Sequence, residues 1–148
     1  MHRPRVPVAT LLLVEDNPAD AELTREALAD GADRHVVVDV YVVPNGIEAL
    51  AFLRRDRAYA DAPRPGLILL DLNLPRLDGR GVLADVKRDA ALQDIPVVVF
   101  SSSAAADDVE RAYALGASGY VVKSMHLDAF FAAVRAIRRL WTSLAAGG

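Results

Sequence analysis

Five polar residues of this sequence are of the types needed to accept and hold a phosphoryl group. They are Glu15, Asp16, Asp71, Ser101 and Lys123. A carboxylate can attack a phosphoryl group without a general base, and Mg²⁺ prefers the oxygen ligands that carboxylates provide. A lysine and a hydroxyl can stabilise the charge on the phosphoryl oxygens. The residue types therefore indicate phosphoryl transfer to an aspartate, provided that the fold brings them together.

The segments that carry these residues alternate between two kinds. Five short apolar runs, rich in β-branched residues, are followed in turn by five helix-like stretches. The runs are residues 10–14, 36–43, 67–70, 95–100 and 120–122, and the helix-like stretches are residues 18–30, 46–55, 81–89, 105–115 and 127–140. This alternation predicts a doubly wound α/β fold, in which helices cover both faces of a five-stranded parallel sheet.

The polar residues stand where the apolar runs end. In an open parallel sheet the carboxyl ends of the strands share one edge, and ligands bind there near the point where the strand order reverses. If the first and third strands are neighbours, Glu15, Asp16 and Asp71 share one pocket. Like charges that close repel strongly unless a cation compensates them. The sequence therefore predicts a Mg²⁺ site, with Lys123 as a second positive charge.

Composition limits what else the chain can do. Its 148 residues suit one domain, and the absence of cysteine excludes disulfides, zinc–thiolate sites and cysteine nucleophiles. A net charge of −3 is too small to predict nucleic acid or an anionic membrane as the main partner. No apolar run suits a signal peptide or a membrane span, so we expect a cytoplasmic protein. We expect a flexible arm at residues 1–9, a domain at 10–141 and a tail at 142–148.

Three motifs resemble those of the receiver domains of two-component response regulators. They are Leu-Leu-Leu-Val-Glu-Asp-Asn at residues 11–17, Asp-Leu-Asn-Leu-Pro-Arg-Leu-Asp-Gly at residues 71–79 and Gly-Ala-Ser-Gly-Tyr-Val-Val-Lys at residues 116–123. The resemblance extends over roughly residues 11–140. It implies the flavodoxin-like strand order 2-1-3-4-5 of the chemotaxis regulator.

The resemblance also implies a role for each site residue. Asp71 would be the phosphorylated aspartate, and Asp16 would bind Mg²⁺ directly. Glu15 would bind the metal through water, and Asn73 would bind it through its backbone carbonyl. Lys123 would pair with a phosphoryl oxygen.

Two further residues would form the switch that follows phosphorylation. Ser101 would supply the hydroxyl that moves toward the phosphate, although Ser102 and Ser103 beside it leave the choice of serine open. Tyr120 would follow it inward, or be a packed strand aromatic and no more. Pro75 and Gly79 match the turn after the third strand.

One position departs from the family pattern. Most receivers have a proline, preceded by a cis peptide bond, after the lysine, whereas this chain has Ser124. A cis bond before a residue other than proline costs about 2.5–4 kcal/mol. The sequence therefore leaves open whether the bond after Lys123 is cis or trans, and with it the position of the Lys123 amine.

A closer resemblance lies in residues 45–65, which include a long loop before the third strand. This loop, the motif Glu-Asp-Asn-Pro-Ala-Asp at residues 15–20 and an extension containing Trp141 resemble the corresponding segments of single-domain regulators paired with bacterial phytochrome histidine kinases. We therefore expect a histidine kinase, of that type, as the phosphoryl donor. We expect output through protein contacts, including a homodimer formed by residues 105–115, 120–122 and the last helix.

Two alternative functions are weighed against this hypothesis. A phosphohydrolase that forms an aspartyl-phosphate usually has a second aspartate two residues after its nucleophile, but Asn73 occupies that position. A pseudo-receiver, which binds partners without phosphorylation, would lack one of the acids or the lysine, and all are present. We therefore expect a phosphorylated regulator and not an enzyme.

Overall fold

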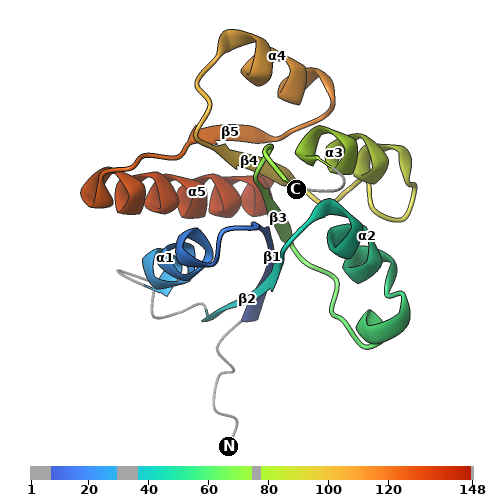
Figure 1. Ribbon diagram of the computed structural model, residues 1–148. Helices are drawn as coiled ribbons and strands as arrows, with labels where there is room; N and C mark the ends of the chain where they lie inside the picture. The colour runs from blue at the N-terminus through green and yellow to red at the C-terminus, as the bar shows by residue number, and fades with distance from the viewer. Residues whose placement is uncertain (1–7, 30–36, 75–77, 148) are drawn as a thin grey trace, which may run out of the picture.

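The computed structural model describes residues 8–29, 37–74 and 78–147, which form one α/β unit (Figure 1). Its elements are β1 (Val8–Val14), α1 (Pro18–Ala29), β2 (Val37–Val43), α2 (Gly46–Arg54), the 3₁₀ turn η1 (Arg57–Tyr59), β3 (Leu67–Leu70), α3 (Gly79–Arg88), β4 (Val97–Ser101), α4 (Ala106–Ala114), β5 (Gly119–Val122) and α5 (Leu127–Gly147). All paired strands are parallel, in the order β2-β1-β3-β4-β5. The predicted fold class and strand order are confirmed.

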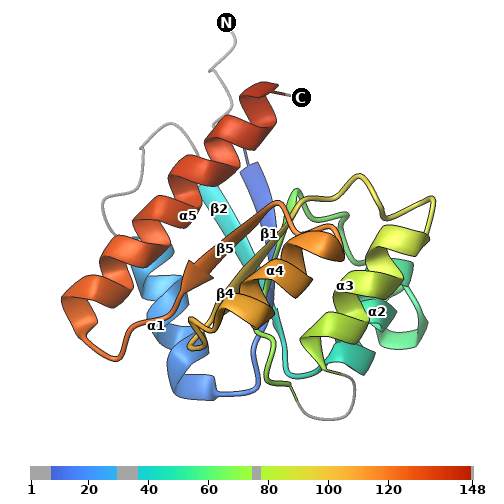
Figure 2. The same ribbon diagram turned by 90° about the horizontal axis from the view of Figure 1, so that it is seen from above.

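Helices cover both faces of the sheet. Helices α1 and α5 lie together on one face, and α2, α3 and α4 lie on the other (Figure 1, and from above in Figure 2). The four residues of β3 are fully buried, as expected for a central strand that has helices over both of its faces. Leu67 and Leu69 pack toward α5, whereas Ile68 and Leu70 pack toward α2 and α3. This strand therefore gives the site beyond its carboxyl end a rigid support.

The start of α1 follows from two adjacent residues. Asn17 caps the helix, because its side-chain oxygen accepts hydrogen bonds from the backbone N–H groups of Ala19 (2.9 Å) and Asp20 (3.2 Å). Pro18 is the first helical residue, where a missing N–H costs nothing. Gly31, which the sequence suggests as the end of this helix, lies outside the described residues. The cap fixes the direction in which the chain leaves the Glu15–Asp16 pair.

The first strand and the last helix extend beyond the domain bounds expected at the two ends of the chain. Strand β1 begins at Val8, inside the expected arm, because Val8 continues the ladder with Val37 of β2. Helix α5 runs to Gly147 and so includes residues 142–147 of the expected tail. Alanine and leucine in its last turn favour the helix. The indole of Trp141 also lies against Gly66, 3.5 Å from the position a Cβ would take there.

No helix among the described residues is long and apolar enough to cross a membrane.

Candidate functional site

Hydrogen bonds to a neighbouring strand hold the first backbone N–H beyond three of the strands, and this fixes the positions of the polar side chains there. The N–H of Glu15 donates to a carbonyl of β2 (3.0 Å), and that of Asp71 donates to the last carbonyl of β1 (3.2 Å). The N–H of Lys123 donates to the carbonyl of Ser101 (2.7 Å), the last residue of β4. The four residues therefore meet at the carboxyl edge of the sheet, as the spacing predicted.

Three carboxylates come together at this edge. Glu15, Asp16 and Asp71 each place one oxygen within 4.8 Å of the others. Glu15 and Asp71 are buried, and Asp16 is exposed. Close oxygen ligands with an open, solvent-facing side suit a hard divalent cation that keeps some of its water. The donor set therefore fits the Mg²⁺ that the sequence predicts.

Lys123 compensates the negative charge of these acids. Its amine lies 2.9 Å from Glu15, 3.1 Å from Asp71 and 3.4 Å from Asp20. The lysine side chain is 9% exposed, so these ion pairs are largely shielded from water. The ring of Phe100 lies 5.4 Å below the amine, within the range of a cation–π contact.

Asp20 is a member of this cluster that sequence reasoning missed. It lies in the first turn of α1, four residues after Asp16. Because the Asn17 cap turns the chain into the helix at this point, Asp20 faces the same edge of the sheet as Glu15. The acidic residue just inside a capped helix was the available signal, but it is equally typical of a helix that is stabilised through its dipole.

The cluster shifts the protonation of its members. Burial, and then the hydrogen bond with Asp71, raise the pKa of Glu15 to about 7. Burial acts to lower the pKa of Lys123, but its hydrogen bond to Glu15 and the charge of Asp71 outweigh burial and raise that pKa. Lys123 therefore remains a cation, and Glu15 holds a proton more readily than an ordinary glutamate does.

The Asp71 carboxylate is held on both sides. Its Oδ1 accepts a hydrogen bond from the backbone N–H of Asn73 (3.0 Å), and its Oδ2 faces Lys123. Gly79 lies against the backbone of Asp71 and Leu72, and its N–H donates a hydrogen bond to the carbonyl of Leu72 (3.1 Å). A Cβ at Gly79 would lie 2.4 Å from the carbonyl oxygen of Asp71, so only glycine fits there. Pro75, predicted in the same turn, lies outside the described residues.

Ser101 and Tyr120 are linked through a third residue. The Ser101 side chain is fully buried, and its Oγ accepts a hydrogen bond from the backbone N–H of Ser103 (3.3 Å). The Tyr120 hydroxyl donates to the carbonyl of the same Ser103 (2.8 Å), while its ring packs against the core. Tyr120 is therefore packed and hydrogen-bonded at once.

The peptide bond after Lys123 is trans, since no peptide bond in the described part of the chain is cis. The Lys123 amine nevertheless reaches Asp71. The absence of a proline at Ser124 therefore does not remove the lysine from the site.

Comparisons with known proteins agree with this geometry. The sequence profile of the response regulator receiver domain matches residues 11–135. Response regulator Rcp1 of Synechocystis is 42% identical over 135 residues, 91% of this chain and 90% of that protein. Among solved structures, the phosphorylated cyanobacterial phytochrome response regulator RcpA is 47% identical, with a TM-score of 0.84 over 91% of this chain and 94% of that one. The Mn²⁺-bound form of Rcp1 is 41% identical, with a TM-score of 0.82 over 90% and 94% of the two chains.

Proposed function

Because the chain belongs to the family of response regulator receiver domains, we propose that Asp71 is the residue through which it is switched, by accepting a phosphoryl group from a histidine kinase. The observation that carries this assignment is the convergence of Asp71, two further acids and Lys123 at one edge of the sheet. Asp71 is a buried acid of this cluster, and Lys123 binds one of its oxygens while a backbone N–H binds the other.

The residues around Asp71 would hold a divalent cation, for which we propose Mg²⁺. Asp16 and Asp71 would bind it directly, Glu15 through water, and Asn73 through its backbone carbonyl. Support comes from the oxygen cluster and from the related regulator Rcp1, which was solved in a Mn²⁺-bound form. When bound, the cation supplies positive charge that offsets the charge on the phosphoryl oxygens.

In the transfer itself, a carboxylate oxygen of Asp71 forms a bond to phosphorus. The bond between phosphorus and the donor's histidine nitrogen breaks, and its electron pair returns to the imidazole ring. Asp71 needs no base, because a carboxylate is already ionised. Lys123 would exchange its contact with Asp71 for one with a phosphoryl oxygen, for which its compact ammonium group is suited.

We propose that the switch runs through Ser101 and Tyr120 to the surface formed by α4, β5 and α5. The support is the chain of hydrogen bonds from Ser101 through Ser103 to Tyr120 on β5. This surface carries the half-exposed apolar side chains of Tyr113 and Val122, which a second copy of the chain would cover in a homodimer. The donor would be a cytoplasmic histidine kinase of the phytochrome type, since the related RcpA is a phytochrome response regulator.

A phosphoryl-transfer assay tests the central assignment. The radiolabelled phosphohistidine of a phytochrome histidine kinase is mixed with the wild-type chain and with Asp71→Asn, with and without Mg²⁺. We expect the wild-type chain to be labelled only when Mg²⁺ is present, and we expect Asp71→Asn to remain unlabelled with or without Mg²⁺. Asp107→Asn is the matched control, because it removes an exposed carboxylate that lies outside this cluster and should retain labelling. Label on Asp71→Asn would show that another residue is the acceptor.

A further inference from the structure

The loop between β4 and α4 is held by one serine. The backbone N–H of Ser103 donates a hydrogen bond to Oγ of Ser101 (3.3 Å). The backbone carbonyl of Ser103 accepts one from the hydroxyl of Tyr120 (2.8 Å). Its hydroxyl donates to Oδ2 of Asp108 (2.5 Å), in the first turn of α4, and accepts from the N–H of Ala105 (3.3 Å). Every polar group of Ser103 is thus engaged, and its contacts reach both neighbouring strands and the next helix.

Asp108 extends this network to another helix. Its Oδ1 pairs with Nη2 of Arg80 in α3 at 2.5 Å, so one carboxylate joins α3 to the loop after β4. The hydrogen bond from Ser103, and then the contact with Arg80, lower the pKa of Asp108, which therefore stays ionised. Because Nε of Arg80 is buried and has no hydrogen-bond partner among the described residues, its pair with Asp108 is the polar contact that orients this side chain.

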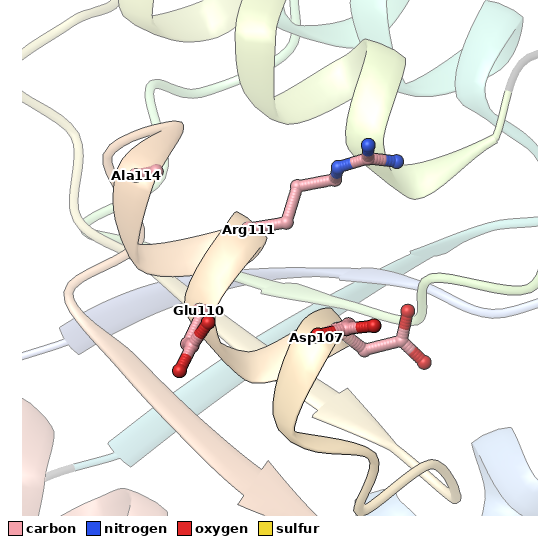
Figure 3. A pocket seen from close by; sticks show the side chains of 5 residues that line it. Asp107, Glu110, Arg111 and Ala114 are labelled. Atoms are coloured by element: carbon pink, nitrogen blue, oxygen red, sulfur yellow. The ribbon is translucent and has the colours of Figure 1, made fainter.

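The Asp108 side of this ion pair borders a pocket on α4. The pocket, about 510 Å³ in volume, is lined by Asp107, Asp108, Glu110, Arg111 and Ala114. Arg111 points from α4 toward α3 (Figure 3). Both Arg80 and Asp108 are 28% exposed at their side chains. Water can therefore reach part of each side chain of this ion pair.

We propose that Arg80 and Asp108 are positioning residues, which clamp Ser103 and so hold the Ser101 hydroxyl in its resting place. The inference rests on the proposed function, in which that hydroxyl moves toward a phosphoryl group on Asp71. For the Ser101 hydroxyl to move, either its hydrogen bond from the N–H of Ser103 must break, or the loop between β4 and α4 must move together with it. The loop resists because Ser103 is tied to Asp108, which is in turn tied to α3.

The clamp sets how much of the protein is in the switched state before phosphorylation. A ligand that requires the switched state binds with an apparent affinity that is reduced by the small fraction of molecules in that state. Releasing the clamp raises this fraction. Variants without the clamp should therefore bind a phosphoryl mimic more tightly, by about fivefold or more. A residue that only supported the fold would leave this affinity unchanged or weaken it.

The test measures the affinity for beryllofluoride in the presence of Mg²⁺, by calorimetry on the full chain. Asp108→Asn, Arg80→Gln and Ser103→Ala each break the clamp at a different point and should bind more tightly than the wild type. Asp107→Asn, which removes an exposed charge from the same turn of α4, should bind as the wild type does. Amide exchange at Ser103 and Ala105, measured without Mg²⁺ or mimic, should be faster in Asp108→Asn.

The outcomes separate the two proposals. If the wild type does not bind the mimic with Mg²⁺, the phosphoacceptor assignment of Asp71 is wrong, and the role given to the clamp falls with it. If the wild type binds and none of the folded clamp variants binds more tightly, only the clamp is wrong. Three variants are used so that the failure of one to fold leaves the test intact.

Discussion

The amine of Lys123 lies 3.1 Å from Oδ2 of Asp71, so the proposed phosphoacceptor is already ion-paired in the unphosphorylated protein. The same amine lies 2.9 Å from Glu15. In the proposed function Lys123 therefore has two roles. It offsets the charge of the buried acids before phosphorylation, and it would contact a phosphoryl oxygen afterwards.

Replacing Lys123 by glutamine should destabilise the protein chiefly when metal is absent. Glu15 and Asp71 would be left buried without a cation, and breaking a buried pair in this way costs about 3–5 kcal/mol. Urea unfolding with and without Mg²⁺ measures this. We expect Mg²⁺ to raise the free energy of unfolding more in the variant than in the wild type. An equal Mg²⁺ effect in both would contradict the compensating role.

The control is Asp20→Asn, which removes the most exposed of the three acids paired with Lys123. A pair this exposed contributes about 0–1 kcal/mol. The unfolding curve of this variant should therefore lie close to that of the wild type.

Alanine at Gly79 should cost more than alanine at Gly119, although each added Cβ would meet another atom at 2.4 Å. At Gly79 that atom is the backbone carbonyl oxygen of Asp71, whereas at Gly119 it is the end of the Leu140 side chain, which can turn away. Overpacking of a rigid site costs about 1–3 kcal/mol. Gly79→Ala should reach the upper part of this range and also weaken Mg²⁺ binding, because the segment that carries Asp71 must shift.

Denaturant unfolding and a Mg²⁺ titration of both variants check this. Gly119→Ala should keep its Mg²⁺ affinity. If the two variants were equally stable and bound Mg²⁺ equally well, the close approach of Gly79 would have no consequence for the site.

The Tyr59 hydroxyl should lose its proton at a higher pH than the hydroxyl of an ordinary tyrosine. Its hydroxyl donates to Glu48 (2.6 Å), and this hydrogen bond, followed by burial, raises the pKa of Tyr59 from 10.0 to about 12. Between these values the folded chain keeps a proton that the unfolded chain has lost. This contribution to stability is therefore complete below pH 10 and falls as the pH rises toward 12.

Ultraviolet absorbance of the phenolate follows this titration. In Glu48→Gln the Tyr59 transition should move down toward the ordinary range, while the other three of the four tyrosines stay where they were. If the transition did not move in Glu48→Gln, the carboxylate would not be its cause.

The alternation of apolar runs and helix-like stretches was sufficient to predict the parallel sheet, but the order of the strands came from the resemblance to receiver domains. With that order, the positions at which the apolar runs end predicted where the site residues meet. A strand that is buried on both faces is continuously apolar, so the first polar residue after Leu70 has to be at the carboxyl edge. The same reasoning placed Glu15, Ser101 and Lys123 there.

What sequence reasoning missed depends on side-chain directions between distant segments. Asp20 reaches Lys123 only because the Asn17 cap sets the path of α1. The pairing of Arg80 with Asp108 depends on how α3 and α4 lie against each other, and no pattern in either helix specifies that. The length of α5 was underestimated because a run of small residues suits a tail as well as a helix.

The fluorescence of Trp141 can report on the position of α5. It is the only tryptophan of the chain, and it lies against Gly66, which precedes β3, whereas Asp71 follows the same strand. The length of β3 thus separates the fluorophore from the phosphoryl site. Its emission should report whether the far half of α5 is docked on the sheet. Phosphorylation that left the surroundings of Trp141 unchanged would be silent in fluorescence, and a change in emission would mean that this part of α5 had changed its contacts with the sheet or with a second copy of the chain.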